Sequence, residues 1–481
     1  MLERQRLAAS ALALALLPGA AFSMDIVQAY RDALANDAIV AAARSQLSAT
    51  REKVPQARAG LLPAVNANAN LGYQTFDTSL APRREFNSQN YSITLSYPLY
   101  RRQNSEVFEQ SKLGVTLAEF QFESVQQDLI LRVSQSYFDV LSAQDTLDTI
   151  RAQKRAISEQ LASAKRNFEV GTATITDQQE AQSRFDLIVA QEFAASNDLD
   201  VKRAALAQLT GKVVPDLKVL RAGVILEPPQ PARETAWTDV ARSNNLVVQQ
   251  AHVASDIAAR EIDRQRYGHH PTLDLVGSTG YFKGGNTQVL SNFDSTSAQI
   301  GVQFVLPLYQ GGGIDARVRE AVSLKEKSLQ DLENARRQAE QAARQTYLGV
   351  NSGLAQVQAL EAAEKSSQLA LDSNLLGYQV GVRNNIDVLV AQQQLFTTRR
   401  DLAKARYDVL LNGLRLKATV GALTETDLQG VAALLDAPVP APAAAPAKTS
   451  IAAPRTAAAP AAAAPAAAAP AGTRPVARAT R

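Results

Sequence analysis

The clearest periodic signal in the chain is a stretch in which apolar and polar side chains alternate one by one. In AVNANANLGYQ, the positions from Val65 to Tyr73 alternate between apolar residues and three asparagines with one glycine. A period of two is typical of a β-strand whose two faces meet different surroundings. Asparagine is a poor strand former, so three on one face indicate a face that stays in contact with water. The opposite face, which carries Val65, Ala67, Ala69, Leu71 and Tyr73, must meet something apolar.

Three further segments alternate in the same way, and prolines lie at their ends. In YSITLSY, larger side chains from Tyr91 to Tyr97 alternate with Ser and Thr, and IGVQFVL repeats the pattern. Proline is tolerated where a strand begins and disrupts the interior of a sheet, so we expect Pro98 and Pro307 to end strands. Four strands are predicted, at about residues 64–74, 89–97, 271–281 and 298–306. Each has about the 9–11 residues that cross a bilayer at a tilt.

The remaining pattern is helical and includes two segments of unusual length. Residues 104–170 hold no Pro and one Gly, and residues 314–380 hold no Pro and three Gly. At 1.5 Å per residue each predicts a helix about 100 Å long, too long for a compact core. Shorter helices are predicted before the strands, at 25–61 and 237–267, and after the long helices, at 177–210 and 387–420. Leu, Val, Ala and Phe at heptad-like spacing favour a coiled-coil wall.

The two halves of the chain share landmarks at a nearly constant offset. Pro63 and Pro271 differ by 208 positions, and the turn glycines Gly171 and Gly381 differ by 210. Chance matches would not keep one register over this length, so we interpret the chain as an internal tandem duplication. The predicted parts are a signal peptide at 1–23, a first repeat at 24–230, a second repeat at 231–435 and a tail at 436–481.

Both ends of the chain differ from the repeats. Arg4 and Arg6 precede an apolar run from Leu7 to Leu17 and then small residues, which predicts a signal peptide too short to span a bilayer. After Leu435 an Ala- and Pro-rich tract with few large apolar side chains predicts a disordered tail. No other window has about 18 uninterrupted apolar residues, so segments that enter a membrane would have to be strands.

Composition argues against most kinds of chemistry. The chain has no Cys, and its net charge of +3 is dispersed, so we expect no thiolate site and no nucleic-acid partner. The histidines, His252, His269 and His270, form no catalytic pattern with Ser and Asp. The run Gly311–Gly313 lacks the GxxxxGK spacing of a phosphate loop and fits a strand-to-helix corner. We therefore predict that the protein is not an enzyme and has no cofactor, catalytic residue or metal site.

The amphipathic strands alone would fit a sheet of a soluble sandwich. Their length and their setting between long helices favour strands that cross a membrane. Four strands cannot close a barrel, and an open sheet edge in hydrocarbon leaves unpaired backbone groups that cost several kcal/mol each. A membrane-spanning sheet would therefore require oligomerisation, with the apolar face on lipid and the asparagines in a water-filled lumen.

These features together resemble the TolC family of outer-membrane channel-tunnel proteins. The resemblance covers about residues 25–428 and rests on HHPTLDLVGSTGY, LPLYQGGG, VGTATITD, GYQVGVRNNIDVL and ARYDVLLNGLRLKATVGALTETDL. It implies an α+β fold of mainly long α-helices, in which a homotrimer forms a twelve-stranded transmembrane β-barrel continued by a periplasmic coiled-coil α-barrel. It also implies a passive exit duct in the cell outer membrane for secreted proteins, small toxic compounds or both. The implied partners are outer-membrane lipid, a periplasmic adaptor (membrane fusion) protein and an inner-membrane transporter of ABC or RND type.

The same resemblance implies roles for residues at the two helix-hairpin turns. The implied adaptor-binding tips are Val170, Gly171, Thr172, Val380, Gly381 and Val382. The implied periplasmic gate, closed by polar links between neighbouring hairpins, is Thr176, Asp177, Tyr378, Arg383 and Asp387. The family also implies two rings of Asp at the entrance, and Val390 stands where the second would be. Taken alone, Asp177 and Asp387 equally fit acidic residues that complement a helix dipole.

A periplasmic coiled-coil scaffold or adaptor with a small soluble β-domain is the alternative, because adaptors also have long helical hairpins. A duplicated pair of bilayer-length strand hairpins is not expected of such a protein, and this favours the channel.

Overall fold

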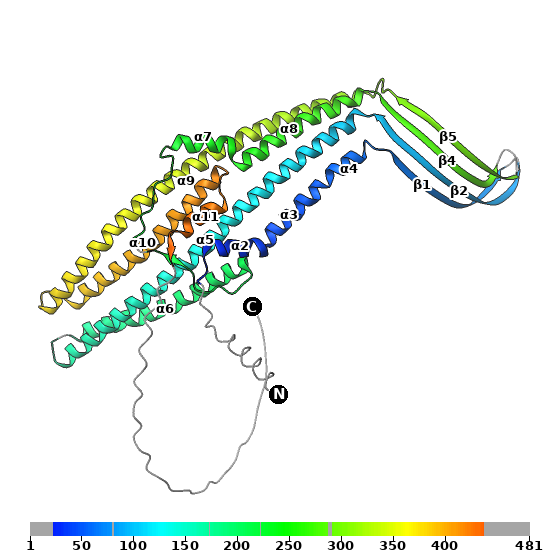
Figure 1. Ribbon diagram of the computed structural model, residues 1–481. Helices are drawn as coiled ribbons and strands as arrows, with labels where there is room; N and C mark the ends of the chain where they lie inside the picture. The colour runs from blue at the N-terminus through cyan, green and yellow to red at the C-terminus, as the bar shows by residue number, and fades with distance from the viewer. Residues whose placement is uncertain (1–22, 79–80, 173, 222, 287–290, 437–481) are drawn as a thin grey trace, which may run out of the picture. The chain divides into compact units, whose positions relative to one another are not determined.

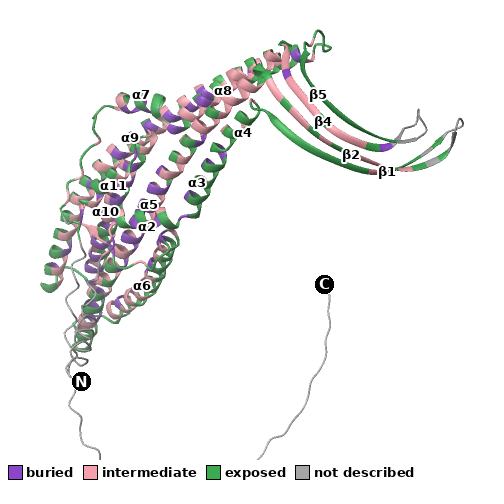
Figure 2. Ribbon diagram, turned by 45° about the vertical axis from the view of Figure 1, so that its right-hand side comes forward, coloured by how far each residue is buried: buried purple, intermediate pink, exposed green. Residues whose placement is uncertain are grey.

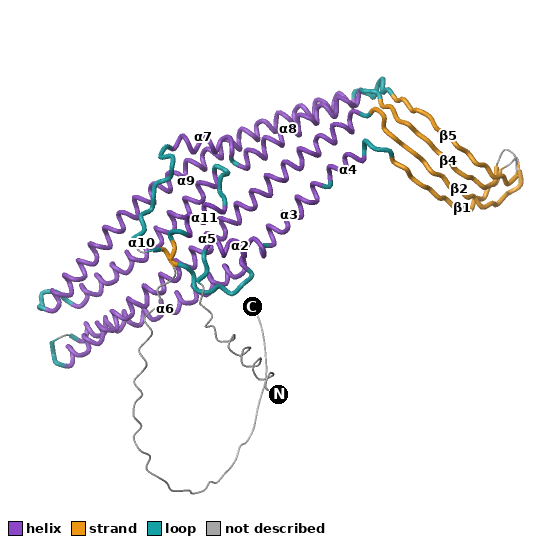
Figure 3. The backbone as a smooth tube through the Cα atoms, viewed as in Figure 1, coloured by secondary structure: helices purple, strands orange, loops and turns teal. Residues whose placement is uncertain are grey.

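The computed structural model describes residues 23–78, 81–172, 174–221, 223–286 and 291–436. The predicted signal peptide and the predicted tail therefore lie almost entirely outside the described residues. Figures 1 and 3 show long helices and a separate group of strands that are joined to the helix ends by short loops.

The two halves of the chain share the order helices, strand pair, long helix and returning helix, whereas α4 and α11 each occur in one half only. The first half contains α2 (Ile26–Asn36), α3 (Ala38–Arg51), α4 (Lys53–Ala59), β1 (Ala64–Thr78), β2 (Ala81–Tyr100), α5 (Arg102–Glu169), α6 (Ile175–Thr210) and β3 (Val219–Leu220). The second contains α7 (Glu234–Asn244), α8 (Leu246–Arg266), the 3₁₀ turn η1 (Tyr267–His269), β4 (Thr272–Asn286), β5 (Ser291–Val305), α9 (Gly313–Gln379), α10 (Asn385–Thr419), α11 (Glu425–Ala432) and β6 (Leu435–Asp436).

The long and returning helices are confirmed to within two residues at each end, whereas the helices before the strands are broken. The break between α2 and α3 lies at Asp37, whose backbone is extended and whose side chain accepts a hydrogen bond from the Val40 amide. The break between α7 and α8 lies at Asn245, whose side chain caps the Val247 amide in the same way. Asp and Asn compete for backbone donors, so they interrupt an otherwise continuous apolar pattern.

The helix α5, which is about 100 Å long at 1.5 Å per residue, changes partners along its length. Near the strands it meets α3 through the ion pair of Arg51 with Glu119. Further along, Arg132 binds Asp37 at 2.8 Å, and closer to the turn Lys154 binds Glu192 of α6 at 2.7 Å. Two shorter segments therefore flank one long helix in succession, as the sequence predicted.

The largest buried cluster lies where these partners change. Leu129, Val133 and Tyr137 follow one another at a spacing of four on α5, and each has an exposed fraction of 0%. The Tyr137 hydroxyl donates toward the carbonyl oxygens of Met24 and Lys218, at 3.0 and 2.9 Å. This hydroxyl thus ties the start of the described chain and the segment before β3 to the middle of the wall.

A half-buried carboxylate joins α5 to α10. The Tyr407 hydroxyl donates to Asp145 Oδ2 at 2.6 Å, and the Tyr407 ring stacks on Phe138. Burial raises the pKa of Asp145 above its ordinary value of 3.8, and the hydrogen bond from Tyr407 only partly opposes this effect. Because the folded state holds this proton more tightly, the stabilising contribution is complete below pH 3.8 and is lost as pH rises through the folded-state pKa.

We predict that Asp145→Asn, which keeps an acceptor for Tyr407, removes this pH dependence. Each unit by which the folded pKa exceeds the unfolded one corresponds to about 1.4 kcal/mol. Thermal unfolding of the purified protein between about pH 7 and pH 4 should show that acidification stabilises the wild type relative to Asp145→Asn. Parallel stability profiles for the two proteins would contradict the assignment.

The four long strands form one antiparallel sheet in the order β1-β2-β4-β5, so β1 and β5 are its edges. The strands run to 15 or 20 residues, longer than predicted. Pro98 does not end β2: it pairs with Asp274, and a shift of register between Pro98 and Tyr100 accommodates the missing amide. Pro307 lies beyond the end of β5, as predicted.

The register gives the two faces of the sheet different chemistry. Residues directly opposite each other in an antiparallel pair share a face. The apolar face contains rows such as Val65, Leu95, Gly277 and Ile300, followed by Ala67, Ile93, Thr279 and Ala298. The other face contains Asn66, Thr94, Ser278 and Gln299, and its apolar exceptions include Phe86, Val276, Phe282, Phe293 and Val305. Val65, Ile93 and Ile300 are 66%, 50% and 75% exposed in the single chain, so no described element covers the apolar face there (Figure 2).

Candidate functional site

The two helix hairpins end in turns of the same construction. Each long helix is followed by a valine and then a glycine in the left-handed region, Gly171 at φ 78° and Gly381 at φ 81°. The amide of Thr172 donates to Asn167 O at 2.8 Å, and the amide of Val382 donates to Gly377 O at 2.9 Å. These bonds close the last helical turn, and glycine is favoured because it adopts positive φ without a steric penalty.

Apolar side chains stand exposed at both turns. Val170, Val380 and Val382 are 72%, 65% and 76% exposed, and open space surrounds both tip glycines. Together with Thr172 these residues are the predicted adaptor-binding tips. Valines held out by rigid turns offer apolar contact at little further entropic cost, which suits a docking surface.

Both returning helices begin with a reciprocal cap. Asp177 accepts from the Thr174 amide while its own amide donates to Thr174 Oγ1 at 3.2 Å. Asp387 forms the same pair with Asn384, whose Oδ1 accepts from the Asp387 amide at 2.8 Å. These carboxylates thus satisfy orphan amides at the positive end of each helix dipole. The interpretation of both aspartates as residues that complement a helix dipole therefore holds, and it is compatible with a further role in the predicted gate.

The predicted gate residues lie at the two turns, Thr176 and Asp177 at the first and Tyr378, Arg383 and Asp387 at the second. The Tyr378 hydroxyl accepts from Asn167 Nδ2 at 3.1 Å, which links α9 to α5 within one chain. Arg383 Nη1 lies 3.7 Å from Asp387 Oδ2 on its own hairpin, and its side chain is 59% exposed. Thr176 is exposed on the first turn of α6, and Val390 is 52% exposed on α10.

Buried amides lie between the hairpins just inside the turns. Gln160 of α5 donates to Asn385 of α10, and both side chains are almost fully buried. Ile157, Ile188 and Leu389 form an apolar cluster beside them, which joins α5, α6 and α10. The start of α10 is therefore seated against the first hairpin of the same chain.

The sequence did not identify the side-chain partners of the residues at the turns. The caps have a recognisable signal, since Thr174 and Asn384 each precede an Asp by three residues. The Asn167 partner of Tyr378 and the Gln160 partner of Asn385 are more than 200 positions away, and one sequence gives no signal for such pairs.

The histidines at the strand–helix junction and the glycine run have contacts or backbone geometry that fit a structural role. His269 Nε2 lies 3.1 Å from Asp315, and Tyr100 lies 3.5 Å from His270, at the junction of strands and helices. Gly311 and Gly312 have positive φ at the corner between β5 and α9. In the part of the chain that the structure describes, no three His, Asp or Glu side chains are grouped to hold a metal. Within those same ranges no helix is long and apolar enough to span a membrane.

Proteins of known name are similar to this chain over most of its length. The profile of the family described as "Outer membrane efflux protein" matches residues 29–212 and 237–422. Outer membrane protein TolC of Vibrio cholerae is 34% identical over 425 residues, which cover 87% of this chain and 95% of that protein. Alkaline protease secretion protein AprF of Pseudomonas aeruginosa is 33% identical over 432 residues, 87% of this chain and 89% of that protein.

A solved structure supports the fold independently. The Campylobacter jejuni CmeC outer membrane channel aligns with a TM-score of 0.71 at 17% identity, over 85% of this chain and 90% of that one. The family and these relatives, which are named for the outer membrane, efflux and protease secretion, support the channel over the adaptor or scaffold alternative. The chain belongs to the outer membrane efflux protein family, and it is an export channel of the cell outer membrane.

Proposed function

We propose that the channel is a homotrimer in which three four-stranded sheets close one twelve-stranded barrel. The observation that carries this proposal is the sheet itself, which has one apolar face, one polar face and two unpaired edges, β1 and β5. Pairing β5 of one copy with β1 of the next satisfies the backbone groups of both edges, and threefold symmetry closes the ring.

The dimensions of the apolar face support a membrane setting. Along β4 this face runs from Leu273, opposite Phe304, to Tyr281, opposite Tyr91. The eight steps between these residues span about 27 Å along a strand, or roughly 20 Å along the membrane normal at the usual tilt, close to the ~25 Å apolar band of outer-membrane barrels. Tyr91 and Tyr281 at one end and Tyr100 at the other match interfacial aromatic girdles.

The helices of the three copies would then continue the pore as a periplasmic α-barrel. The tandem repeat explains why each copy supplies two equivalent hairpins to this wall. The exposed tip valines would dock on a periplasmic adaptor, which in turn contacts an ABC or RND transporter of the inner membrane. The names of relatives, a protease secretion protein and an efflux protein, support polypeptides and small compounds as cargo.

The gate would be closed where hairpins of neighbouring copies meet at the entrance. Arg383 is exposed enough to exchange its contact with Asp387 for Thr176 or Asp177 of the next copy. Tyr378 would stay on its own chain through Asn167, so it fixes the position of α9 while Arg383 makes the contact between copies.

A cysteine scan of the sheet edges tests the trimer, and the absence of native Cys makes it clean. Ala67→Cys on β1 is combined in turn with Ala298→Cys, Ile300→Cys and Val302→Cys on β5. The three combinations sample different registers between β5 of one copy and β1 of the next. In one combination, oxidation of outer membranes should yield a covalent three-chain species, since opposed residues of antiparallel strands lie at disulfide distance.

The single-Cys variants should remain monomeric on a denaturing gel. A ladder that continues beyond three chains would contradict a closed ring, because an open arrangement has no limit. Absence of any crosslink in all three combinations would contradict the β5–β1 pairing.

A further inference from the structure

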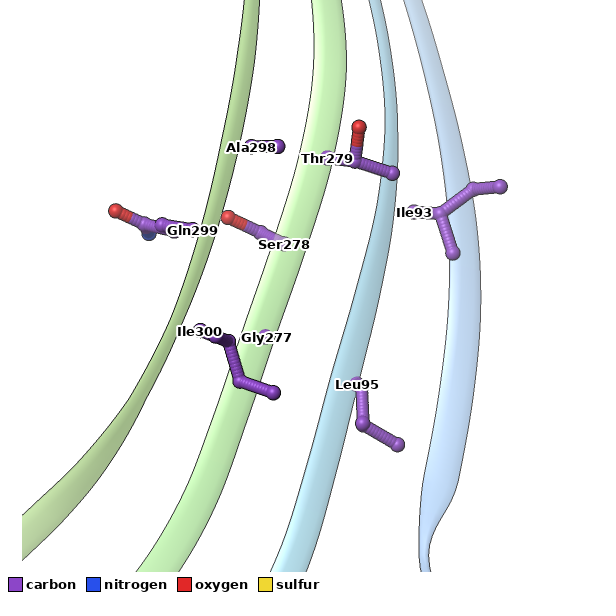
Figure 4. Close-up of a pocket in the computed structure, with 8 residues that line it drawn as sticks. All are labelled: Ile93, Leu95, Gly277, Ser278, Thr279, Ala298, Gln299 and Ile300. Atoms are coloured by element: carbon purple, nitrogen blue, oxygen red, sulfur yellow. The ribbon is translucent and has the colours of Figure 1, made fainter.

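The apolar face of the sheet contains a shallow depression near the middle of its apolar band. It has a volume of about 370 Å³ and lies over β2, β4 and β5. Its lining residues are Ile93, Leu95, Gly277, Ser278, Thr279, Ala298, Gln299 and Ile300 (Figure 4). Figure 4 shows Ile93, Leu95 and Ile300 pointing to one side of the sheet and Ser278 and Gln299 to the other.

A single glycine creates this depression. Gly277 lies between Leu95 and Ile300 in one row of the register, and it contributes no side chain to the face. A Cβ built there would lie 3.6 Å from Gln299 O and 3.7 Å from Leu95 Cβ, which is ordinary contact. The backbone therefore does not require glycine by close approach, and the missing side chain leaves a groove between two branched ones.

A positive charge lies on the same face at the distance of a lipid headgroup. Lys283 is six residues from Gly277 on β4 and shares its face, about 20 Å away along the strand. At the usual strand tilt this is roughly 15 Å along the membrane normal, half the thickness of a bilayer core. Lys283 lies toward the strand turns, away from the helices, and so on the exterior side of the proposed barrel.

We propose that this face binds one anionic lipid of the outer leaflet, with an acyl chain in the depression at Gly277 and its phosphate at Lys283. The inference rests on the proposed barrel, in which this face meets lipid. The groove gives the acyl chain of the lipid van der Waals contacts that a flat surface lacks, because Leu95 and Ile300 form the two sides of the groove. The lysine gives the preference for a negative headgroup.

The test is photocrosslinking of the reconstituted full-length channel in phosphatidylcholine vesicles. The probe is a phosphatidylglycerol with a diazirine near the end of one acyl chain, and the comparison probe is the matching phosphatidylcholine. Crosslinks mapped by mass spectrometry should concentrate on the lining residues of β4 and β5, and the phosphatidylglycerol probe should react more.

Gly277→Leu should abolish the clustering of crosslinks at the lining residues, because the leucine side chain fills the groove. Gly301→Leu is the matched control, because Gly301 lies on the opposite face of β5 in open space, and it should react like the wild type. Lys283→Gln should lower the preference for phosphatidylglycerol about fivefold, the effect of one lysine near an anionic surface. Asp294 lies opposite Lys283 in the register, so Asp294→Asn should raise that preference.

The outcomes separate the lipid site from the barrel. Crosslinks spread evenly over the apolar face, unchanged by Gly277→Leu, would overturn the site and leave the barrel intact. Equal reaction of both probes, unchanged by Lys283→Gln, would overturn the role of the lysine and with it the anionic lipid. Crosslinks to the Asn66 face alone would overturn the proposed barrel orientation.

Discussion

Ile93→Arg should nearly abolish assembly of the channel into the outer membrane, whereas Ser92→Arg, one residue away, should be tolerated. Ile93 lies in the row next to the centre of the apolar band, opposite Ala67 and Thr279. A charged residue on the lipid face at the bilayer midplane costs about 2–4 kcal/mol, and the trimer incurs this cost in three copies. The measurement is the amount of heat-resistant oligomer in outer-membrane fractions at matched expression.

Two controls make the comparison sharp. Ser92 points to the opposite face with Asn68, where an arginine would enter water and alter conductance instead. Leu71 lies opposite Gln89, which pairs with Lys283, so its row is at the edge of the band. Leu71→Arg should therefore cost only about 0–1 kcal/mol. Equal assembly of the Ile93 and Ser92 variants would show that the assigned facing is wrong.

The strands and long helices could be predicted because their signals are local. The alternation around Asn66, Asn68 and Asn70 fixes the two faces of β1 before any partner strand is known. The long run without proline between 104 and 170 similarly predicts α5 to within two residues. A pattern of this kind depends on the period of one element and its surroundings, and one sequence contains that information.

The breaks and partners could not be predicted because they depend on distant contacts. Asp37 ends α2 where it can both cap α3 and bind Arg132, which is 95 residues away. Pro98 stays inside β2 because a local shift of register against β4 accommodates it. At the turns, the positions of Tyr378 and Arg383 came from the family resemblance, while the Asn167 partner of Tyr378 came only from the fold.

Arg383→Ser combined with Tyr378→Phe should open the entrance, with larger single-channel conductance in planar bilayers and unchanged trimer assembly. The first substitution removes the exposed guanidinium proposed to link copies, and the second removes the acceptor for Asn167. An exposed link contributes about 0.2–1 kcal/mol, and threefold symmetry repeats the Arg383 link in each copy, whereas loss of the Tyr378 hydroxyl loosens the seating of α9 against α5 within each copy. At about the middle of this range, the closed state would lose roughly an order of magnitude in relative population. Wild-type conductance of the double variant would refute the assigned gate.

Asp387 requires a different design, because the structure gives its carboxylate a second role. Asp387→Ala would remove both the negative ring and the cap on α10, so a change in conductance could come from fraying of the helix. Asp387→Asn keeps an acceptor for the Asn384 amide and removes only the charge. Three carboxylates around a narrow entrance favour cations, so block by a trivalent cation should weaken in Asp387→Asn.

Val390 is exposed three residues further along α10, and Val390→Asp should strengthen the block by adding a second ring. If block is the same in wild type, Asp387→Asn and Val390→Asp, the carboxylate of Asp387 serves the helix cap alone and the pore narrows elsewhere.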